Sequence, residues 1–285
     1  MDKKDTLLIE SVEMALSEGL NNIPSAQTIN YNNCGVTIVK VETQKEAEVL
    51  GREQGNYITV ELDKIYKIDD DAFESVVDVV ANVLKKFTDN YRGKRILVVG
   101  IGNREITADS IGPKTIDRII VTRGLENTEL IGEGCFGNLS ALCTDVFGKT
   151  GIESAEIIEG VTKVIRPSLV IVVDSLATTK LERLCKSVQI SDTSISPGAG
   201  VENERKKISS NLLETPIVSI GVPTVISTDL LVEKESRLKD FSNSLISIPS
   251  QIVTATDLGA KLIAFSINKA IHYDLSTEDI LKFLY

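Results

Sequence analysis

Short runs of consecutive apolar residues mark the strands that the sequence predicts. Three of them stand out at residues 95–100, 169–173 and 216–220, where RILVVG, LVIVV and PIVSI contain few polar side chains. Runs of this length and composition are typical of strands that are buried on both faces of a parallel sheet. A further run at residues 35–39 predicts another strand near the N-terminus.

Apolar residues at intervals of three and four predict helices around these strands. The clearest patterns cover residues 71–87, 152–165 and 256–272. Further helices are predicted at 5–20, in the polar stretch before residue 50, from Pro113 to about Thr122 and from Ser276. Strands that alternate with helices favour an α/β fold with a mostly parallel sheet flanked by helices. No linker or shift in composition divides the chain, so we expect one domain over residues 1–285.

Composition and charge exclude several classes of protein. With 42% hydrophobic and 25% charged residues, the chain can bury a full core, which excludes disorder over most of its length. Its net charge of −10 is opposite to that of most proteins that bind bare nucleic acid, so we expect no direct nucleic-acid partner. No apolar run approaches the length of a membrane span, and the N-terminus lacks a signal-peptide cleavage site. We therefore expect no membrane partner and a cytoplasmic location.

Histidine and cysteine are too sparse for the common metal and nucleophile sites. The four cysteines form no CxxC pair, and the single histidine, His272, stands near the C-terminus, far from any nucleophile motif. These counts exclude zinc sites that need two histidines, and they disfavour a Ser-His-Asp site. We expect no metal, no cofactor and reduced thiols.

Two aspartates follow predicted strands and are the candidate catalytic residues. Asp109 comes just beyond strand 95–100, and Asp174 directly ends strand 169–173, with a helix or loop expected over 176–184. In an open parallel sheet, ligands bind beyond the carboxyl ends of the strands. Two carboxylates in one cleft there can hold a water and share a proton. The same residues also suit structural roles, with Asp109 capping a helix and Asp174 stabilising a turn.

The loop Gly100-Ile-Gly-Asn103 follows the first of these strands. A glycine-rich loop after a strand can bind the phosphates of a nucleotide, but the third glycine of the dinucleotide motif is absent here. Asn103 is a candidate substrate-binding residue, because its side chain can donate a hydrogen bond to a carbonyl; it can equally satisfy the turn itself.

Residues 191–211 form the least regular stretch, and we expect a long functional loop there. Its cations, Arg205, Lys206 and Lys207, are candidates for binding a carboxylate on the substrate, although a solvated charge run has the same appearance.

Nine blocks of sequence, in order across residues 95–225, resemble those of the spore germination endopeptidase family, and a weaker match continues through 252–272. The blocks are VVGIGN (98–103), TADSIGP (107–113), IVTRG (120–124), TGIE (150–153), VVDSLA (172–177), QISD (189–192), SPGAGV (196–201), RKKIS (205–209) and IGVPTV (220–225). Together these blocks are far more specific than any one of them.

The resemblance implies an atypical aspartic-type endopeptidase that degrades small acid-soluble spore proteins when a spore germinates. It implies a zymogen, a homotetramer and a location in the forespore or spore core. The aspartates of the two family motifs match Asp109 and Asp174, which favours them as the catalytic pair. The family fold is similar to that of the hydrogenase maturation proteases, a phosphorylase/hydrolase-like fold.

The N-terminus departs from the family pattern. Thr6-Leu-Leu-Ile-Glu-Ser11 is the nearest match to the segment that ends the family's propeptide, with about five residues before it. Residues 1–15 are therefore interpreted as a short or vestigial propeptide. Two alternatives stay open: an inactive or re-regulated paralogue that binds spore proteins, and a nucleotide-binding α/β protein that uses the loop at 100–103.

Overall fold

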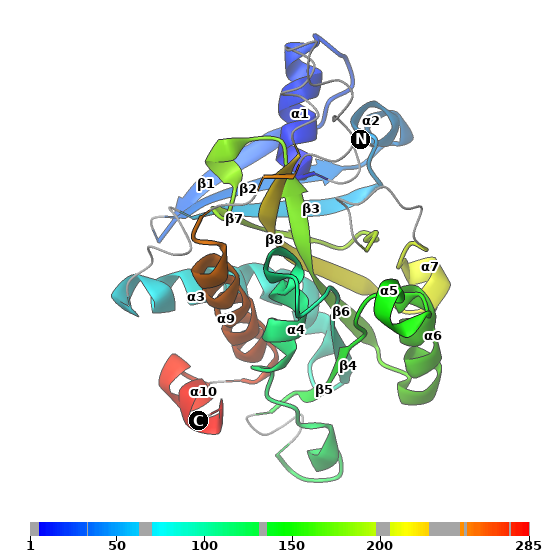
Figure 1. The fold of residues 1–285 in the computed structure, drawn as a ribbon, viewed down its shortest axis with the longest axis vertical. Helices are drawn as coiled ribbons and strands as arrows, with labels where there is room; N and C mark the ends of the chain where they lie inside the picture. Colours follow the sequence, from blue (N-terminus) through cyan, green and yellow to red (C-terminus); the bar gives the residue numbers. More distant parts are fainter. Residues whose placement is uncertain are drawn as a thin grey trace.

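A computed structural model describes residues 6–32, 34–62, 70–130, 136–197, 206–227, 246–247, 250–273 and 275–284. Its centre is one twisted sheet with helices on both sides (Figure 1). The strands are β1 (Ala26–Tyr31), β2 (Cys34–Val41), β3 (Gly55–Glu61), β4 (Arg95–Gly100), β5 (Asn138–Cys143), β6 (Leu169–Thr178), β7 (Ser187–Ser191), β8 (Ile217–Ser227) and β9 (Ile246–Ser247). The α-helices are α1 (Leu8–Ser17), α2 (Gln44–Leu50), α3 (Asp70–Thr88), α4 (Ile111–Ile116), α5 (Phe147–Thr150), α6 (Ser154–Ile165), α7 (Ser210–Leu213), α9 (Ile252–Ile271) and α10 (Thr277–Leu284). Short 3-10 turns are η3 (Asp89–Tyr91), η4 (Thr107–Asp109), η5 (Arg123–Leu125) and η6 (Leu181–Arg183).

The sheet has a parallel half and an antiparallel half. Its strand order is β1-β2-β3-β7-β8-β6-β4-β5, with β9 paired to β8. Strands β8, β6, β4 and β5 run parallel, whereas β1, β2, β3, β7 and β8 pair antiparallel. The expected α/β class is confirmed, but the parallel arrangement is confined to these four strands. The remaining strands extend the sheet as antiparallel neighbours, so the sheet is mixed.

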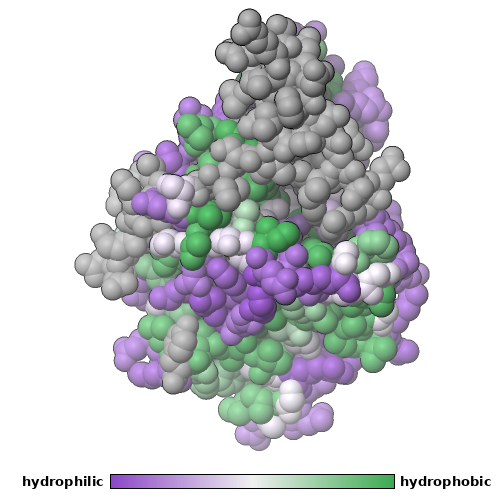
Figure 2. All heavy atoms as spheres, viewed as in Figure 1, coloured by the Kyte–Doolittle hydropathy of each residue, from purple (hydrophilic) through white to green (hydrophobic). Residues whose placement is uncertain are grey.

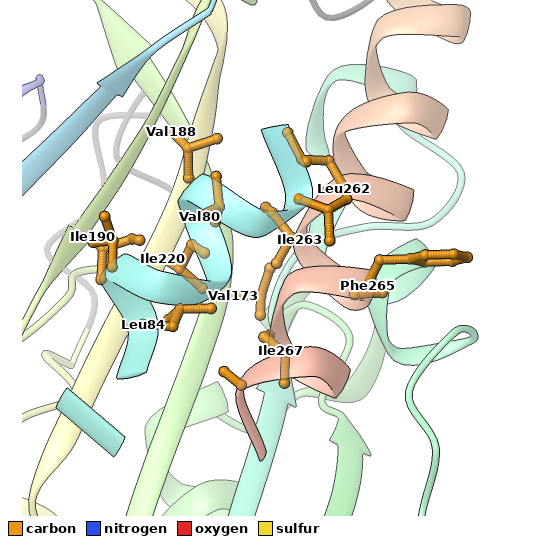
Figure 3. Close-up of a cluster of buried hydrophobic side chains, with 14 of the residues drawn as sticks. Val80, Leu84, Val173, Val188, Ile190, Ile220, Leu262, Ile263, Phe265 and Ile267 are labelled. Atoms are coloured by element: carbon orange, nitrogen blue, oxygen red, sulfur yellow. The ribbon is translucent and has the colours of Figure 1, made fainter. Parts of the chain in front are cut away.

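Helices α3 and α9 cover one face of the sheet, where they form the largest apolar core. In Figure 3, Val80 and Leu84 of α3 point toward Ile190 and Ile220 of the sheet, and Ile263 of α9 lies beside them. All five side chains are almost completely buried. Burying an aliphatic side chain of this size contributes about 1.5–3 kcal/mol, so this layer fixes the sheet on which the candidate site is built.

Two smaller cores cover the opposite face. Helix α6 packs Ala155 and Ile158 against Val99 and Val172 of the parallel half. Helices α1 and α2 pack on the antiparallel half, in a cluster made of Leu7, Leu8, Ile9, Val12, Ala15, Val39, Val41, Ala47, Leu50 and Tyr57. The N-terminal helix is therefore part of the folded domain.

The predicted strand at 95–100 is confirmed at its exact bounds by β4, and α3, α6 and α9 confirm the three clearest helices. Three boundaries were wrong. The strand predicted at 216–220 is β8, which continues to Ser227. Strand β6 continues through Asp174 to Thr178, because its polar residues pair with β8 in the ladder. Helix α4 ends at Ile116, well before Thr122, since the chain beyond it turns to bury Ile119 and to bond with α9.

Hydrophilic side chains form a band across one face of the molecule, at about the height of α4 and α5 (Figure 2). Within the residues described, no helix is both long and apolar enough to span a membrane.

Candidate active site

The site begins where β4 ends and α4 starts. Two glycines let these elements meet: a Cβ on Gly100 would lie 2.4 Å from the carbonyl oxygen of Gly112, and a Cβ on Gly112 would lie 2.2 Å from that of Ile101. Ile101 also donates its N–H to the carbonyl of Val173 at 2.9 Å, which ties the loop to the neighbouring strand β6. The loop after β4 is therefore held against the carboxyl end of the parallel strands.

Asp109 is the last residue of η4 and lies against this loop. Its Oδ2 accepts the backbone N–H of Asn103 at 2.8 Å. Gly102 has φ +118°, and a Cβ there would lie 2.1 Å from the backbone oxygen of Asp109. The conformation and the close approach both require glycine. The loop is thus shaped around Asp109.

Asn103 contributes its backbone to this arrangement, while its side chain closes the turn. Its Oδ1 accepts the N–H of Glu105 at 3.0 Å. The sequence singled out the side-chain amide; the contact with Asp109 is made by the backbone N–H instead.

Asp174 lies on β6 at the same end of the sheet, and only 1% of its surface is exposed. Its Oδ1 accepts the N–H of Ser175 at 2.8 Å. It pairs with Gly221 of β8, and the preceding residue, Val173, pairs with Gly100 of β4. Parallel neighbours lie about 4.8 Å apart, so Asp174 is one strand spacing from the loop that holds Asp109. Turn η4 contacts both β6 and β8.

A pocket of about 300 Å³ opens on the face of the sheet that carries Asp174. Side chains alternate along a strand, so Asp174 shares a face with Leu176, which lines this pocket. Gly221, the strand partner of Asp174, lines it as well. The remaining lining residues are Thr6, Gly51, Arg52, Glu53, Tyr57, Gln189, Ser191, Thr193, Ser194, Ile195, Ser196, Lys207, Ser219 and Ile220. Hydroxyl groups and three charged side chains make this a polar pocket beside Asp174.

The predicted cations separate in space. Lys207 lines the pocket and forms an ion pair with Glu53, which also accepts the N–H of Ser194 at 3.0 Å. Lys206 instead bonds to Glu159 of α6 at 3.3 Å. Arg205 lies outside the described residues. Next to Lys207, Ile208 forms an isolated antiparallel bridge with Ile195.

Glu53 stays ionised in this wall. Burial alone would raise its pKa, but the hydrogen bonds from Lys207 and Ser194 outweigh burial and lower the pKa. The carboxylate therefore compensates Lys207 in the pocket as it stands, and any anion that binds there competes with Glu53.

The first helix is fastened to this part of the sheet by polar contacts that the sequence pattern did not reveal. The N–H of Leu8 donates to Gln189 Oε1 at 2.8 Å, and Glu13 forms an ion pair with Arg183 at 2.6 Å. Glu10 is buried and accepts the backbone N–H of Thr179 at 2.8 Å. These contacts hold the chain so that Thr6 forms part of the pocket wall.

His272 takes no part in the site. It is completely buried at the end of α9, where Nδ1 accepts the N–H of Gly137 at 3.3 Å and Nε2 lies 2.9 Å from the carbonyl of Ile120. Within the described part of the chain, no cluster of three or more His, Cys, Asp or Glu residues could hold a metal ion.

Comparison with known proteins identifies the family. The family model for germination protease, peptidase family A25, matches residues 7–235. The germination protease of Clostridium tetani is 31% identical over an alignment of 323 positions, which spans 100% of both chains. That of Caldanaerobacter subterraneus subsp. tengcongensis is 41% identical over 192 residues, which are 67% of this chain and 59% of that protein. Among solved structures, the NiFe hydrogenase maturation protease HycI from Thermococcus kodakarensis aligns with a TM-score of 0.39 and 20% identity, covering 65% of this chain and 98% of that one. The chain thus belongs to the germination protease family of peptide-bond hydrolases.

Proposed function

We propose that the protein is an endopeptidase that begins the degradation of small acid-soluble spore proteins during germination, with Asp109 and Asp174 as its catalytic pair. One observation carries the assignment to these residues. The aspartates of the two matching motifs come from separate parts of the chain, and both are held at the carboxyl end of adjoining parallel strands, with a polar pocket next to Asp174.

The reaction proposed is direct attack by water on the scissile carbonyl. One carboxylate of the pair removes a proton from the water as its oxygen bonds to the carbonyl carbon. The other carboxyl, protonated at that stage, donates its proton to the carbonyl oxygen. When the tetrahedral intermediate collapses, the C–N bond breaks and the leaving nitrogen takes the proton held by the first carboxyl. A hydroxyl of the intermediate returns its proton to the second carboxylate, which restores the pair. The products are a new carboxyl group and a new amine.

The different surroundings of the two aspartates suit this division of labour. Asp174 is enclosed in the sheet, whereas Asp109 is half-buried on the surface turn η4. Unlike environments of this kind separate the acid from the base in a pair of carboxyl groups.

The pocket beside Asp174 is the proposed binding site for substrate side chains next to the scissile bond. Its hydroxyls and Lys207 supply hydrogen-bond donors for an acidic or amide side chain. Asn103 and Arg205 are also proposed to contact the substrate, whereas Lys206 is paired with Glu159 of α6 and is left out of this proposal. We further propose synthesis as a zymogen, assembly as a homotetramer and action in the spore core, on the strength of the family alone.

The nucleotide-binding alternative has less support. The N–H of Asn103 is already donated to Asp109, and Gly102 is packed against the same residue. The backbone N–H and the glycine that a phosphate would need in the loop at 100–103 are therefore already occupied by Asp109.

Cleavage of a purified small acid-soluble spore protein tests the proposal. Wild-type protein should yield discrete fragments, and Asp109→Asn or Asp174→Asn should each lower the rate by at least about 100-fold with unchanged circular dichroism. Asp117→Asn is the matched control, because Asp117 is an exposed carboxylate on the same segment that pairs with Arg104. Wild-type-like cleavage by either site variant removes that aspartate from the mechanism. Binding of the spore protein without cleavage by the wild type supports the inactive paralogue.

A further inference from the structure

Strand β8 carries an irregularity next to the site. Its pairing with β6 runs in step from Val170↔Ile217 to Leu176↔Pro223, and then resumes at Ala177↔Val225. Thr224 is skipped, so β8 holds one more residue than β6 over this interval. An extra residue of this kind bends the strand and re-aims a side chain, and such irregularities gather beside active sites.

The side chain that is re-aimed reaches η4. Thr224 Oγ1 donates a hydrogen bond to the carbonyl oxygen of Ala108 at 2.6 Å, and Thr224 has no exposed surface. Ala108 immediately precedes Asp109. A short bond from a fully buried hydroxyl fixes the height of this turn above the strands.

Turn η4 is therefore held from two sides. On the β4 side, the backbone N–H of Asn103 binds the carboxylate of Asp109. On the β8 side, the hydroxyl of Thr224 binds the backbone one residue earlier. The same strand β8 also pairs with Asp174 through Gly221. Strand β8 thus contacts Asp174 directly and contacts the turn that carries Asp109.

We propose that Thr224 is a positioning residue that sets the placement of Asp109 relative to Asp174. The inference rests on the proposed function, because it concerns the geometry of the catalytic pair. Without the hydroxyl, the carbonyl of Ala108 loses its buried donor, and η4 must move toward solvent or another donor to satisfy it. That movement carries Asp109 away from its partner.

Thr224→Val tests the role, because valine keeps the shape of threonine and removes the donor. A small displacement of a catalytic group lowers turnover by about 10- to 100-fold, so kcat should fall by that factor while KM changes by less than about 3-fold. The acidic limb of the pH profile of kcat should move as well, since the coupling within the pair depends on its spacing. Thr224→Ser retains the hydroxyl and should keep kcat within about 3-fold of wild type.

Thr122→Val is the matched control. Thr122 is another buried threonine that donates to a backbone carbonyl, that of Gly137, away from η4. It should lower the melting temperature and leave kcat and its pH profile unchanged. If Thr224→Val fails to fold, Thr224→Ala, which is smaller and also lacks the donor, takes its place with the same expected loss of kcat.

Two results would overturn the inference: a donor-free variant with wild-type kcat and pH profile, or a Thr224→Ser enzyme as impaired as the donor-free one. Asp109→Asn, measured in parallel, separates this failure from that of the proposed function. An active Asp109→Asn enzyme refutes the catalytic pair itself. An inactive Asp109→Asn enzyme beside a fully active Thr224→Val enzyme refutes the positioning role alone.

Discussion

Lowering the pH from 7 to 5 should destabilise this protein, and the protonation of one residue, His272, should account for the loss. His272 is the only histidine in the sequence and is fully buried. Burial lowers its pKa from the ordinary value of 6.5 to about 4, although the hydrogen bond to the carbonyl of Ile120 opposes the change. The geometry explains the direction. Nδ1 must be unprotonated to accept the N–H of Gly137, and a proton there would face that N–H directly.

The sign and size follow from linkage. Between pH 6.5 and pH 4 the unfolded chain binds a proton at His272 that the folded protein does not, so the free energy of unfolding falls as the pH falls. With pKa values of 6.5 and about 4, the loss between pH 7 and pH 5 is about 2 kcal/mol. The stabilisation is fully present above pH 6.5.

Urea denaturation at pH 7, 6 and 5 measures this loss. Carboxylates with lowered pKa, such as Glu13 at about 2, lose their stabilising effect only as the pH falls below 4.5, so this range isolates the histidine. His272→Gln supplies the control, because glutamine can donate and accept hydrogen bonds but does not titrate. The variant should be less stable at pH 7 and show a much smaller loss between pH 7 and pH 5. Equal pH dependence in the two proteins would refute the reasoning.

Two further predictions concern the N-terminal helix and the pocket. Deleting residues 1–15 should lower the melting temperature strongly, because Leu7, Leu8 and Val12 are buried and each contributes about 1.5–3 kcal/mol. An unchanged melting temperature would show that the helix is dispensable. Lys207→Ala should raise KM for the spore-protein substrate at low salt, and the difference from wild type should be smaller at high salt. Lys206→Ala should leave KM unchanged, because Lys207 lines the pocket and Lys206 pairs with Glu159. Equal effects of the two variants on KM would argue against this assignment.

The parallel half of the sheet could be predicted because burial on both faces leaves a direct trace in the sequence. Strand β4 and the first half of β6 are nearly continuous runs of valine, leucine and isoleucine. Strands β1 and β7 leave little trace. β1 (AQTINY) is exposed along its whole length, and β7 (SVQIS) mixes polar and apolar residues. Their pairing is decided by neighbours that are distant in the sequence, which no local pattern contains.

The candidate pair could be found from the sequence, whereas its supports could not. Asp109 and Asp174 stand beyond or at the end of recognisable apolar runs, so the topology of a parallel sheet places both at the same end of the sheet. Thr224 has no such signal, since its role depends on a change of register between β6 and β8. The separation of Lys206 from Lys207 was equally hidden, because adjacent side chains in an extended segment point in opposite directions.

The mixed sheet also determines the order in which the protein can fold. Strand β3, which completes the N-terminal layer, pairs with β7, and the start of α1 bonds to Gln189 across 181 residues of sequence. As the chain leaves the ribosome, the first sixty residues emerge long before their partners exist. Contacts at such separation slow folding and leave apolar surface exposed in the meantime. The N-terminal helix, the pocket wall and the Asp174 side of the candidate site therefore cannot be assembled in a growing chain until β7 and β8 have been synthesised.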